Sequence, residues 1–435
     1  MIAILGAGPA GAAVALGLRR LGFEVTLVSE WRRFAALEGV SVRVLEALRG
    51  AGLHHALAEA TLPSQRQVSW NGQQHAQNIE YLLDRPAFDR GLREDLRLAG
   101  VELIEGRVLG VQSLATGARI EIEGHGVLAC DFLVEARGRQ APASHKALGK
   151  GLRGPETVSL LNRWQGPPGE TASAVESLED GWAWMARRAD GQCYWQWTVD
   201  VASAQLPGKA QLLEYCRQRR QGSALGRAFF GADAEAKVEA QLHARSSTAI
   251  LSPQVCGDQW IRVGDAAMAV DPLSGNGIFQ SLSSALQAPV VINTLLRKPE
   301  RAALAQRFHQ QRVEQLFLRF ARIGRDFYAD EQRWADQPFW LARRQWPDAE
   351  VAHAQADFAS LRIERAPVLR DGFVDEAEVV ITADQPLGIW HLQGIELAPL
   401  LRRLSVEPVG QVLAGLSVEQ GKVVRGWLLA QGYKP

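Results

Sequence analysis

The chain has 435 residues, a length typical of two or three domains. It has 48 Lys and Arg residues against 48 Asp and Glu residues, and this balance argues against a general nucleic-acid-binding surface. No apolar run reaches the roughly 18 residues that a membrane span needs, so no membrane association is expected. The four cysteines are scattered without metal-ligand spacing, which favours a reducing, cytoplasmic setting and no metal site.

The first elements predict a nucleotide-binding unit. A buried strand is expected over 2–5, the sequence GAGPAG follows at 6–11, a helix is expected over 12–21, and a second strand over 22–28. In this context glycines permit a tight turn and let backbone approach a pyrophosphate, which the free N–H groups of the helix N-terminus stabilise. An acid at the end of the second strand can accept hydrogen bonds from ribose. The predicted contacts are Gly6, Gly8, Pro9, Ala10, Gly11 and Glu30, and this fingerprint leaves NAD and FAD both open.

Later segments alternate between strands expected to form a β-sheet and segments typical of a nucleotide-binding domain. Residues 101–127 alternate like hairpin strands, and a strand at 131–135 runs into the turn Ala136-Arg137-Gly138. Further strands are expected over 157–164, 172–178, 181–188 and 193–201, and a helix over 209–220. A strand at 260–263 then leads through GDAAMAVDPLSGNGI (264–278) into a helix expected over 277–296.

These motifs, in this order, resemble the FAD-dependent aromatic hydroxylase superfamily, whose relatives include the flavin-dependent halogenases. The resemblance implies an α/β fold, in which a Rossmann-type FAD domain (1–66, 84–154 and 249–298) is interleaved with a β-sheet substrate domain (67–83 and 155–248). It implies that Asp265 binds the ribityl chain of FAD and that Gly275, Asn276 and Gly277 lie against the isoalloxazine ring. It also assigns Arg85, Val108, Gly264, Pro272 and Ile278 to the cofactor site.

Two positions depart from the superfamily pattern. Arg137 stands where an Asp is usual before the glycine, and Met268 stands where many members have His. The first departure weakens any inference about the contacts of that turn. The second removes a polar group near the flavin.

Two sequence motifs resemble those of halogenases, but the residues that halogenase chemistry needs are missing. Trp182-Ala183-Trp184 and the Val270–Leu273 segment resemble halogenase motifs. Halogenases, however, use a lysine in the N-terminal region, and the first lysine of this chain is Lys146. Ser274 replaces the halogenase glutamate, and Arg187 replaces the proline that closes the Trp-x-Trp motif. Hydroxylation is therefore expected, with O2 as oxidant and a flavin C4a-hydroperoxide as the reagent that the resemblance implies.

Four tryptophans are candidates for the substrate pocket. Trp182 and Trp184, like Trp195 and Trp197, are spaced so that each pair shares one strand face, and a hairpin through Asp190-Gly191 brings the pairs close together. They can form an aromatic wall for a flat substrate, or simply fill the core of the sheet. For proton handling the candidates are Asp271 and its neighbour Pro272; Asp271 can instead cap the flavin helix.

The C-terminal part carries no nucleotide motif. A helical region is expected over 299–370, followed by a small α+β module over 371–435 with strands at 379–381 and 388–390. Its helices are expected over 397–404, 408–416 and 422–431, with Pro408 at a first helical position. A cap over the neighbouring domain and a docking module for a partner stay open, while mixed charges argue against a DNA reader.

Within the superfamily the chain most resembles the bacterial flavoproteins of tryptophylquinone maturation. That resemblance implies hydroxylation of an indole, a peptidyl tryptophan in a protein substrate. Hydroxylation of a free aromatic metabolite, and a non-catalytic flavoprotein scaffold, remain alternatives. NADH or NADPH is compatible as a transient reductant, although no second nucleotide fingerprint is present.

Overall fold

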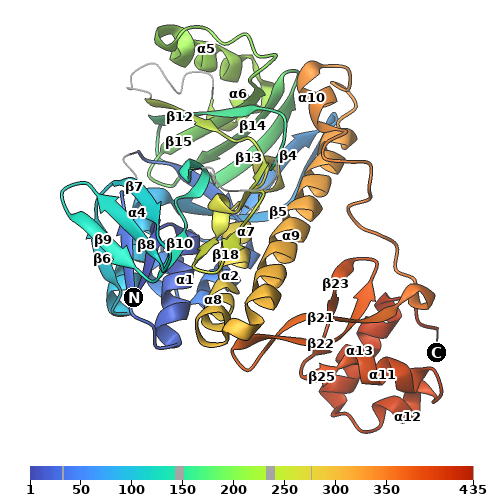
Figure 1. Ribbon diagram of the computed structural model, residues 1–435. Helices are drawn as coiled ribbons and strands as arrows, with labels where there is room; N and C mark the ends of the chain where they lie inside the picture. Colours follow the sequence, from blue (N-terminus) through green and yellow to red (C-terminus); the bar gives the residue numbers. More distant parts are fainter. Residues whose placement is uncertain (32–33, 143–150, 232–240, 276, 435) are drawn as a thin grey trace. The chain divides into compact units, whose positions relative to one another are not determined.

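The computed structural model describes residues 1–31, 34–142, 151–231, 241–275 and 277–434 (Figure 1). The chain forms two compact units, one of Met1–Pro289 with Val313–Glu350 and the other of Val290–Arg312 with Val351–Pro435. Among the described helices none is both long and apolar enough to cross a membrane. The discontinuous FAD and substrate domains expected from the sequence lie in the first unit except for residues 290–298, which belong to the second, and the boundaries between these domains stay a prediction.

A six-stranded sheet forms one half of the first unit. Its strand order is β18 (Cys256–Gly257), β19 (Trp260–Arg262), β10 (Phe132–Glu135), β1 (Ile2–Leu5), β2 (Val25–Ser29) and β6 (Glu102–Glu105), and every pair is parallel except β18–β19. Every residue of β1 and β2 is buried, as expected for strands covered on both faces. The meander β7 (Val108–Ser113), β8 (Ala118–Ile122) and β9 (Gly126–Cys130) packs its apolar face against this sheet.

An eight-stranded sheet forms the other half (Figure 1, green to blue). Its order is β16 (Gln241–Ser246), β12 (Thr157–Gln165), β15 (Gln192–Asp200), β14 (Gly181–Arg187), β13 (Ala172–Leu178), β4 (Ser64–Trp70), β5 (Gln73–Asp84) and β3 (Leu37–Val40). Residues 67–70 and 73–83, within the segment that the sequence assigns to the substrate domain, thus lie in this sheet. Helices α5 (Lys209–Gly222) and α6 (Ala224–Phe230) cover one face, and the end of α9 (Ala302–Asp330) with α10 (Pro338–Arg343) covers the other.

The prediction of one continuous helix over 277–296 is wrong, because the structure has two helices there. Helix α7 (Gly277–Ala285) ends before α8 (Ala288–Arg297) begins. Pro289 explains the break, since a proline has no N–H to continue the hydrogen-bond ladder and its ring crowds the preceding turn. The same proline packs against α1 (Pro9–Arg20): a Cβ on Gly17 would lie 2.5 Å from its Cγ.

The second unit is a small α+β body. Strands β21 (Arg362–Arg370), β22 (Phe373–Thr382) and β23 (Gln385–Ile389) form one sheet, and β24 (His391–Leu392) pairs with β25 (Ile395–Glu396). Helices α11 (Leu397–Leu404), α12 (Val409–Leu413) and α13 (Val418–Ala430) follow. Residues 362–370, placed in the helical region by the sequence, are a strand. Pro408 is the N-cap of α12 rather than its first helical residue.

Candidate functional site: a cavity between the two sheets

One cavity of about 2150 Å³ runs through the first unit between the two sheets. It extends from the glycine turn after β1, past the ends of β2 and β10, to side chains of the eight-stranded sheet. Ordinary small-molecule sites occupy roughly 300–1,000 Å³. The space is therefore large enough for an extended cofactor together with a bulky substrate.

The glycine turn at residues 6–11 forms one end of the cavity. Gly6 has φ 104°, and a Cβ there would lie 2.5 Å from the Ala136 carbonyl oxygen. A Cβ on Gly11 would lie 1.9 Å from the Gly6 carbonyl oxygen. A Cβ on Gly8 would meet nothing, because Gly8 faces the open cavity at the N-cap of α1. Two glycines are thus required by packing, and the third leaves the helix N-terminus open to a ligand.

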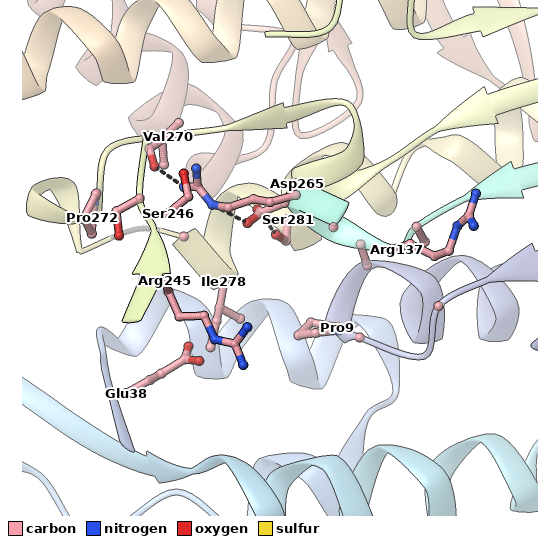
Figure 2. Close-up of a pocket in the computed structure, with 18 of the residues that line it drawn as sticks. Pro9, Glu38, Arg137, Arg245, Ser246, Asp265, Val270, Pro272, Ile278 and Ser281 are labelled. Carbon is pink, nitrogen blue, oxygen red and sulfur yellow. Dashed lines mark hydrogen bonds and ion pairs between the residues drawn. The ribbon is translucent and has the colours of Figure 1, made fainter. Parts of the chain in front are cut away.

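The Asp265 carboxylate lies at the cavity wall, held from two sides (Figure 2). Ser281 of α7 donates its hydroxyl to Oδ1 at 2.9 Å, and the Arg139 guanidinium lies 3.6 Å from Oδ2. Arg139 is itself fixed by the carbonyls of Thr248 and Val270. Burial raises the pKa of the Asp265 carboxyl, while Arg139 and Ser281 oppose that rise. A third of the side chain stays open to the cavity, so the carboxylate is available to a ligand hydroxyl.

Most of the remaining expected cofactor residues line the same cavity. Glu30 is exposed at its wall, directly after β2, and Val108 lines it at the start of β7. Arg85 begins α4 (Arg85–Leu98) and is buried, with ion pairs to Glu38 at 3.1 Å and Asp89 at 2.8 Å. The cavity is further lined by Pro9, Ala10, Pro272, Gly275, Gly277 and Ile278. Gly264 and Gly11 shape the turns behind it, and Asn276 lies outside the described residues.

Asp271 caps the turn that follows it. Its Oδ1 accepts the backbone N–H of Leu273 at 2.9 Å, at the start of the 3-10 turn η3 (Pro272–Ser274). It also accepts the hydroxyl hydrogen of Tyr328, at 2.9 Å. The cap therefore serves the turn before α7 rather than α7 itself. An acid–base role of Asp271 or Pro272 stays a prediction.

The four tryptophans do not form one wall. In the β14–β15 hairpin Ala183 pairs with Trp197 and Met185 with Trp195, so the second pair of tryptophans lies on the opposite sheet face from the first. Trp182 and Trp184 line the cavity. Trp195 and Trp197 are buried beneath α5 and α6 and belong to the core. The sequence spacing identified the shared face within each pair, but the hairpin register separates the pairs.

Three side chains that the sequence did not single out anchor the cavity wall. Arg66 of β4 lies 3.2 Å from the Glu80 carboxylate of β5, and the Trp184 indole N–H donates to the other Glu80 oxygen at 3.2 Å. Arg66 also reaches the Gly275 turn, where a Cβ would lie 4.0 Å from its Nη1. Tyr328, from α9, completes the wall behind Trp182. No local motif marks these residues, because strand pairing and helix packing bring them together. Ser281 of α7 likewise meets Asp265, which lies 16 residues earlier in the chain and outside the helix that carries Ser281.

Comparison with known proteins decides which nucleotide this cavity holds. The family model described as the FAD binding domain matches residues 1–315. The chain belongs to this FAD-binding family. It is a flavin-dependent oxidoreductase of the hydroxylase and halogenase type with FAD as cofactor. The glycine fingerprint left NAD and FAD both open, and the family match selects FAD.

The chain is similar to three proteins of known name or structure. It is 65% identical to a solved structure titled peptidyl tryptophan dihydroxylase QhpG, essential for tryptophylquinone cofactor biogenesis, covering 100% of this chain and 99% of the other with a TM-score of 0.87. It is 24% identical over 387 residues to a tryptophan 2-halogenase of Chondromyces crocatus, covering 79% of this chain and 70% of the relative. The flavin-dependent halogenase CmlS shares the fold, with 15% identity, a TM-score of 0.74 and coverage of 99% and 94%.

The residues present fit FAD. The open face of Gly8 and the first turn of α1 can take a pyrophosphate, and Glu30 stands where a ribose would follow. Asp265 offers an oriented carboxylate for the ribityl hydroxyls. The turn at Gly275, with φ 61°, brings backbone rather than side chains to the cavity.

Proposed function

We propose that the chain hydroxylates the indole ring of a tryptophan held within a protein substrate, during biogenesis of a tryptophylquinone cofactor. The observation that carries this proposal is the 65% identity, over essentially both full lengths, to the peptidyl tryptophan dihydroxylase. The match spans the segments that form the cavity walls as well as those of the FAD site. The proposal includes O2 as co-substrate and NADH or NADPH as reductant.

The cavity suits this substrate class. FAD, once bound and reduced, supplies the activated oxygen that attacks an electron-rich ring. Trp182 and Trp184 offer apolar ring surface to the substrate indole, and each has its own N–H tied back, to Tyr328 and Glu80. These hydrogen bonds fix the planes of two indole rings that are almost fully buried, with 3% and 8% of their surface exposed, so the wall offers the substrate a fixed apolar surface.

The chain's own charges support the cofactor. The N-terminus of α1 favours the negative pyrophosphate, and α7 begins at Gly277, where its first amides favour negative charge on the neighbouring ring system. Asp265 is oriented by Ser281 and Arg139 before any ligand arrives. The protein thus contributes orientation and electrostatics, and the cofactor contributes the oxidation.

A reducing, cytoplasmic location is part of the proposal. All four cysteines are free and buried, as expected for a chain that works without disulfides. Burial raises the pKa of Cys193 and Cys216 to about 11 and that of Cys256 to about 12, so these thiols stay protonated and unreactive.

The proposal is tested by supplying the holoenzyme and a reductant with two substrates, a tryptophan-bearing protein partner and free tryptophan. We expect tryptophan oxygenation in the protein and only slow turnover of the free amino acid. Rapid hydroxylation of a small free aromatic, with none of the protein, would favour the metabolite hydroxylase instead. Addition of chloride or bromide is the control for halogenation, and no halogenated product is expected.

A further inference from the structure

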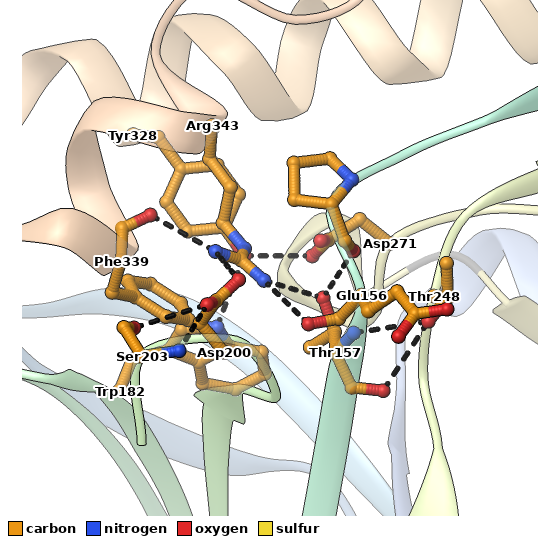
Figure 3. Close-up of polar contacts among 11 residues, drawn as sticks. Glu156, Thr157, Trp182, Asp200, Ser203, Thr248, Asp271, Tyr328, Phe339 and Arg343 are labelled. Carbon is orange, nitrogen blue, oxygen red and sulfur yellow. Dashed lines mark hydrogen bonds and ion pairs between the residues drawn. The ribbon is translucent and has the colours of Figure 1, made fainter.

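The hydroxyl of Tyr328 joins two walls of the cavity by hydrogen bonds (Figure 3). The side chain comes from α9 and is buried, with 2% of its surface exposed. The Trp182 indole N–H donates to the Tyr328 oxygen at 3.1 Å. The Tyr328 hydroxyl in turn donates a hydrogen bond to Asp271 Oδ1, at 2.9 Å. One hydroxyl therefore connects a strand of the eight-stranded sheet to the segment that precedes α7.

The far end of this chain of contacts sets the shape of a turn. Asp271 Oδ1 also accepts the Leu273 amide, which opens η3, and the turn closes at Gly275 in the left-handed conformation. Pro272 and Gly275 both line the cavity. The near end is Trp182, which lines the same cavity from the sheet. Tyr328 thus lies between the surface proposed to hold the indole and the turn assigned to the flavin ring.

Aromatic rings and a buried guanidinium surround the Tyr328 side chain. The rings of Phe339 and Trp340 pack edge-on against Tyr328, with centroids 5.7 Å and 5.8 Å away. The nearby Arg343 guanidinium is held by Asp200 at 3.1 Å and by other partners. Burial raises the pKa of Tyr328 well above its ordinary value. The phenol therefore stays protonated and acts as the hydrogen-bond donor to Asp271. With donor and acceptor both satisfied, movement at either end breaks a buried hydrogen bond.

We propose that Tyr328 is a positioning residue that couples Trp182 of the substrate wall to the turn Pro272–Gly275 of the flavin site. A shift of either the indole-binding surface or the cofactor turn is therefore transmitted to the other through Tyr328. The statement that the wall holds an indole rests on the proposed function. The link of Tyr328 to the cofactor rests on the FAD family and on the contacts alone.

The chain offers a matched control for the test. Tyr328→Phe removes the hydroxyl and keeps the ring, so Trp182 loses its acceptor and Asp271 loses a donor. Tyr194→Phe also removes a buried tyrosine hydroxyl from the same apolar cluster, but that hydroxyl donates to Gln192, at 3.1 Å, away from the turn. Asp271→Asn is the second variant, and it weakens the acceptor without removing the Tyr328 ring.

Two readouts are measured on each variant. The first is the FAD affinity of the apoprotein, from flavin fluorescence. The second is coupling, the share of reductant that ends in oxygenated tryptophan rather than hydrogen peroxide. For Tyr328→Phe we expect FAD affinity to fall about tenfold, as for the loss of the one hydrogen bond that Tyr328 makes to the flavin-site segment, and coupling to fall with it. Tyr194→Phe should match the wild type in both.

The double variant sharpens the result. If Tyr328 acts through Asp271, adding Asp271→Asn to Tyr328→Phe should lower FAD affinity little further than either change alone. Fully additive losses, wild-type values for Tyr328→Phe, or equal losses for Tyr194→Phe would each overturn the inference. FAD affinity needs no substrate, so it tests Tyr328 even if the wild type oxygenates no protein tryptophan; that last result would instead refute the proposed function.

Discussion

Arg66 and Glu80 form an ion pair, with 3.2 Å between Nη1 and Oε1, on neighbouring strands at the cavity wall. Glu80 is buried and also accepts the Trp184 indole N–H. Gly39 on β3 makes room for it, since a Cβ there would lie 2.3 Å from the carboxylate. A single carboxylate therefore fixes both a cation beside the Gly275 turn and an aromatic ring of the proposed substrate wall.

We predict that Glu80→Gln lowers the free energy of unfolding by about 1–3 kcal/mol, because Arg66 is left without its charge partner in a partly buried site. Oxygenation of the tryptophan substrate should fall as well, since the single amide oxygen of Gln cannot replace both the oxygen that accepts from Arg66 and the one that accepts from Trp184. Urea denaturation and product analysis check the two effects. The control is Glu94→Gln, which breaks an exposed pair with Arg97 on α4 and should leave the denaturation midpoint unchanged.

The glycine turn gives a prediction that separates folding from cofactor binding. Gly11→Ala places a methyl group 1.9 Å from a carbonyl oxygen and should prevent soluble folding. Gly8→Ala meets no protein atom, so the variant should fold with normal thermal stability while binding FAD more weakly. Thermal unfolding of the apoprotein and FAD titration measure the two properties. Wild-type FAD affinity in a folded Gly8→Ala protein would show that the pyrophosphate lies elsewhere.

The two sheet faces predict different losses for two tryptophans. Trp195→Ala empties a fully buried position beneath α5 and should cost about 3–5 kcal/mol of unfolding free energy. Trp182→Phe, on the cavity face, should retain most of the stability but lower the rate of substrate oxygenation. Equal effects of the two variants on both measurements would contradict the assignment of only one face to the substrate.

Two buried carboxylates predict opposite dependence of stability on pH. Burial alone would raise the pKa of Glu331, but Arg333, the Ser177 hydroxyl and the Asn71 amide together lower it. Its contacts therefore add stability above the unfolded-state pKa of about 4.3. That contribution is lost as pH falls through the lower folded-state pKa. The stability advantage of the wild type over Glu331→Gln should be greatest near neutral pH and shrink in acid.

Glu176 supplies the contrasting case. Burial raises its pKa, and the hydrogen bonds from Ser223 oppose the rise without cancelling it. Ionisation of Glu176 in the folded state thus costs stability as pH rises above about 4.3. Glu176→Gln should become more stable relative to the wild type as pH rises. Denaturation curves of both variants across the acid range check the two slopes, and slopes of the same sign would contradict this account.

The elements with a strong local signal were predictable from the sequence. Strand β1, the glycine turn and the strands β12 to β15 follow from apolar runs, alternation and glycine chemistry, and the structure places β1 and β13 at the residues expected. Helix α11 likewise matches its expected bounds. The resemblance of three motifs supplied the flavin, which the fingerprint alone did not.

What the sequence could not supply were relations between distant segments. The face on which Trp195 lies depends on the hairpin register, which shifts every side chain when it changes by one residue. Tyr328 meets Asp271 across 57 residues, and Arg139 meets Asp265 through the packing of two turns. Strand β21 was missed because its charged residues alternate with apolar ones only weakly, and pairing with β22 decides its conformation.

The central claim is oxygen transfer to a tryptophan within a protein, and isotope labelling tests it most directly. The holoenzyme is incubated with reductant, a tryptophan-bearing protein partner and dioxygen of the heavy isotope, and the partner's peptides are analysed by mass spectrometry. We predict heavy oxygen on the indole ring of one tryptophan, with none in a sample that lacks FAD or reductant. An unlabelled partner, while reductant is consumed and a free aromatic compound gains the label, would contradict the account.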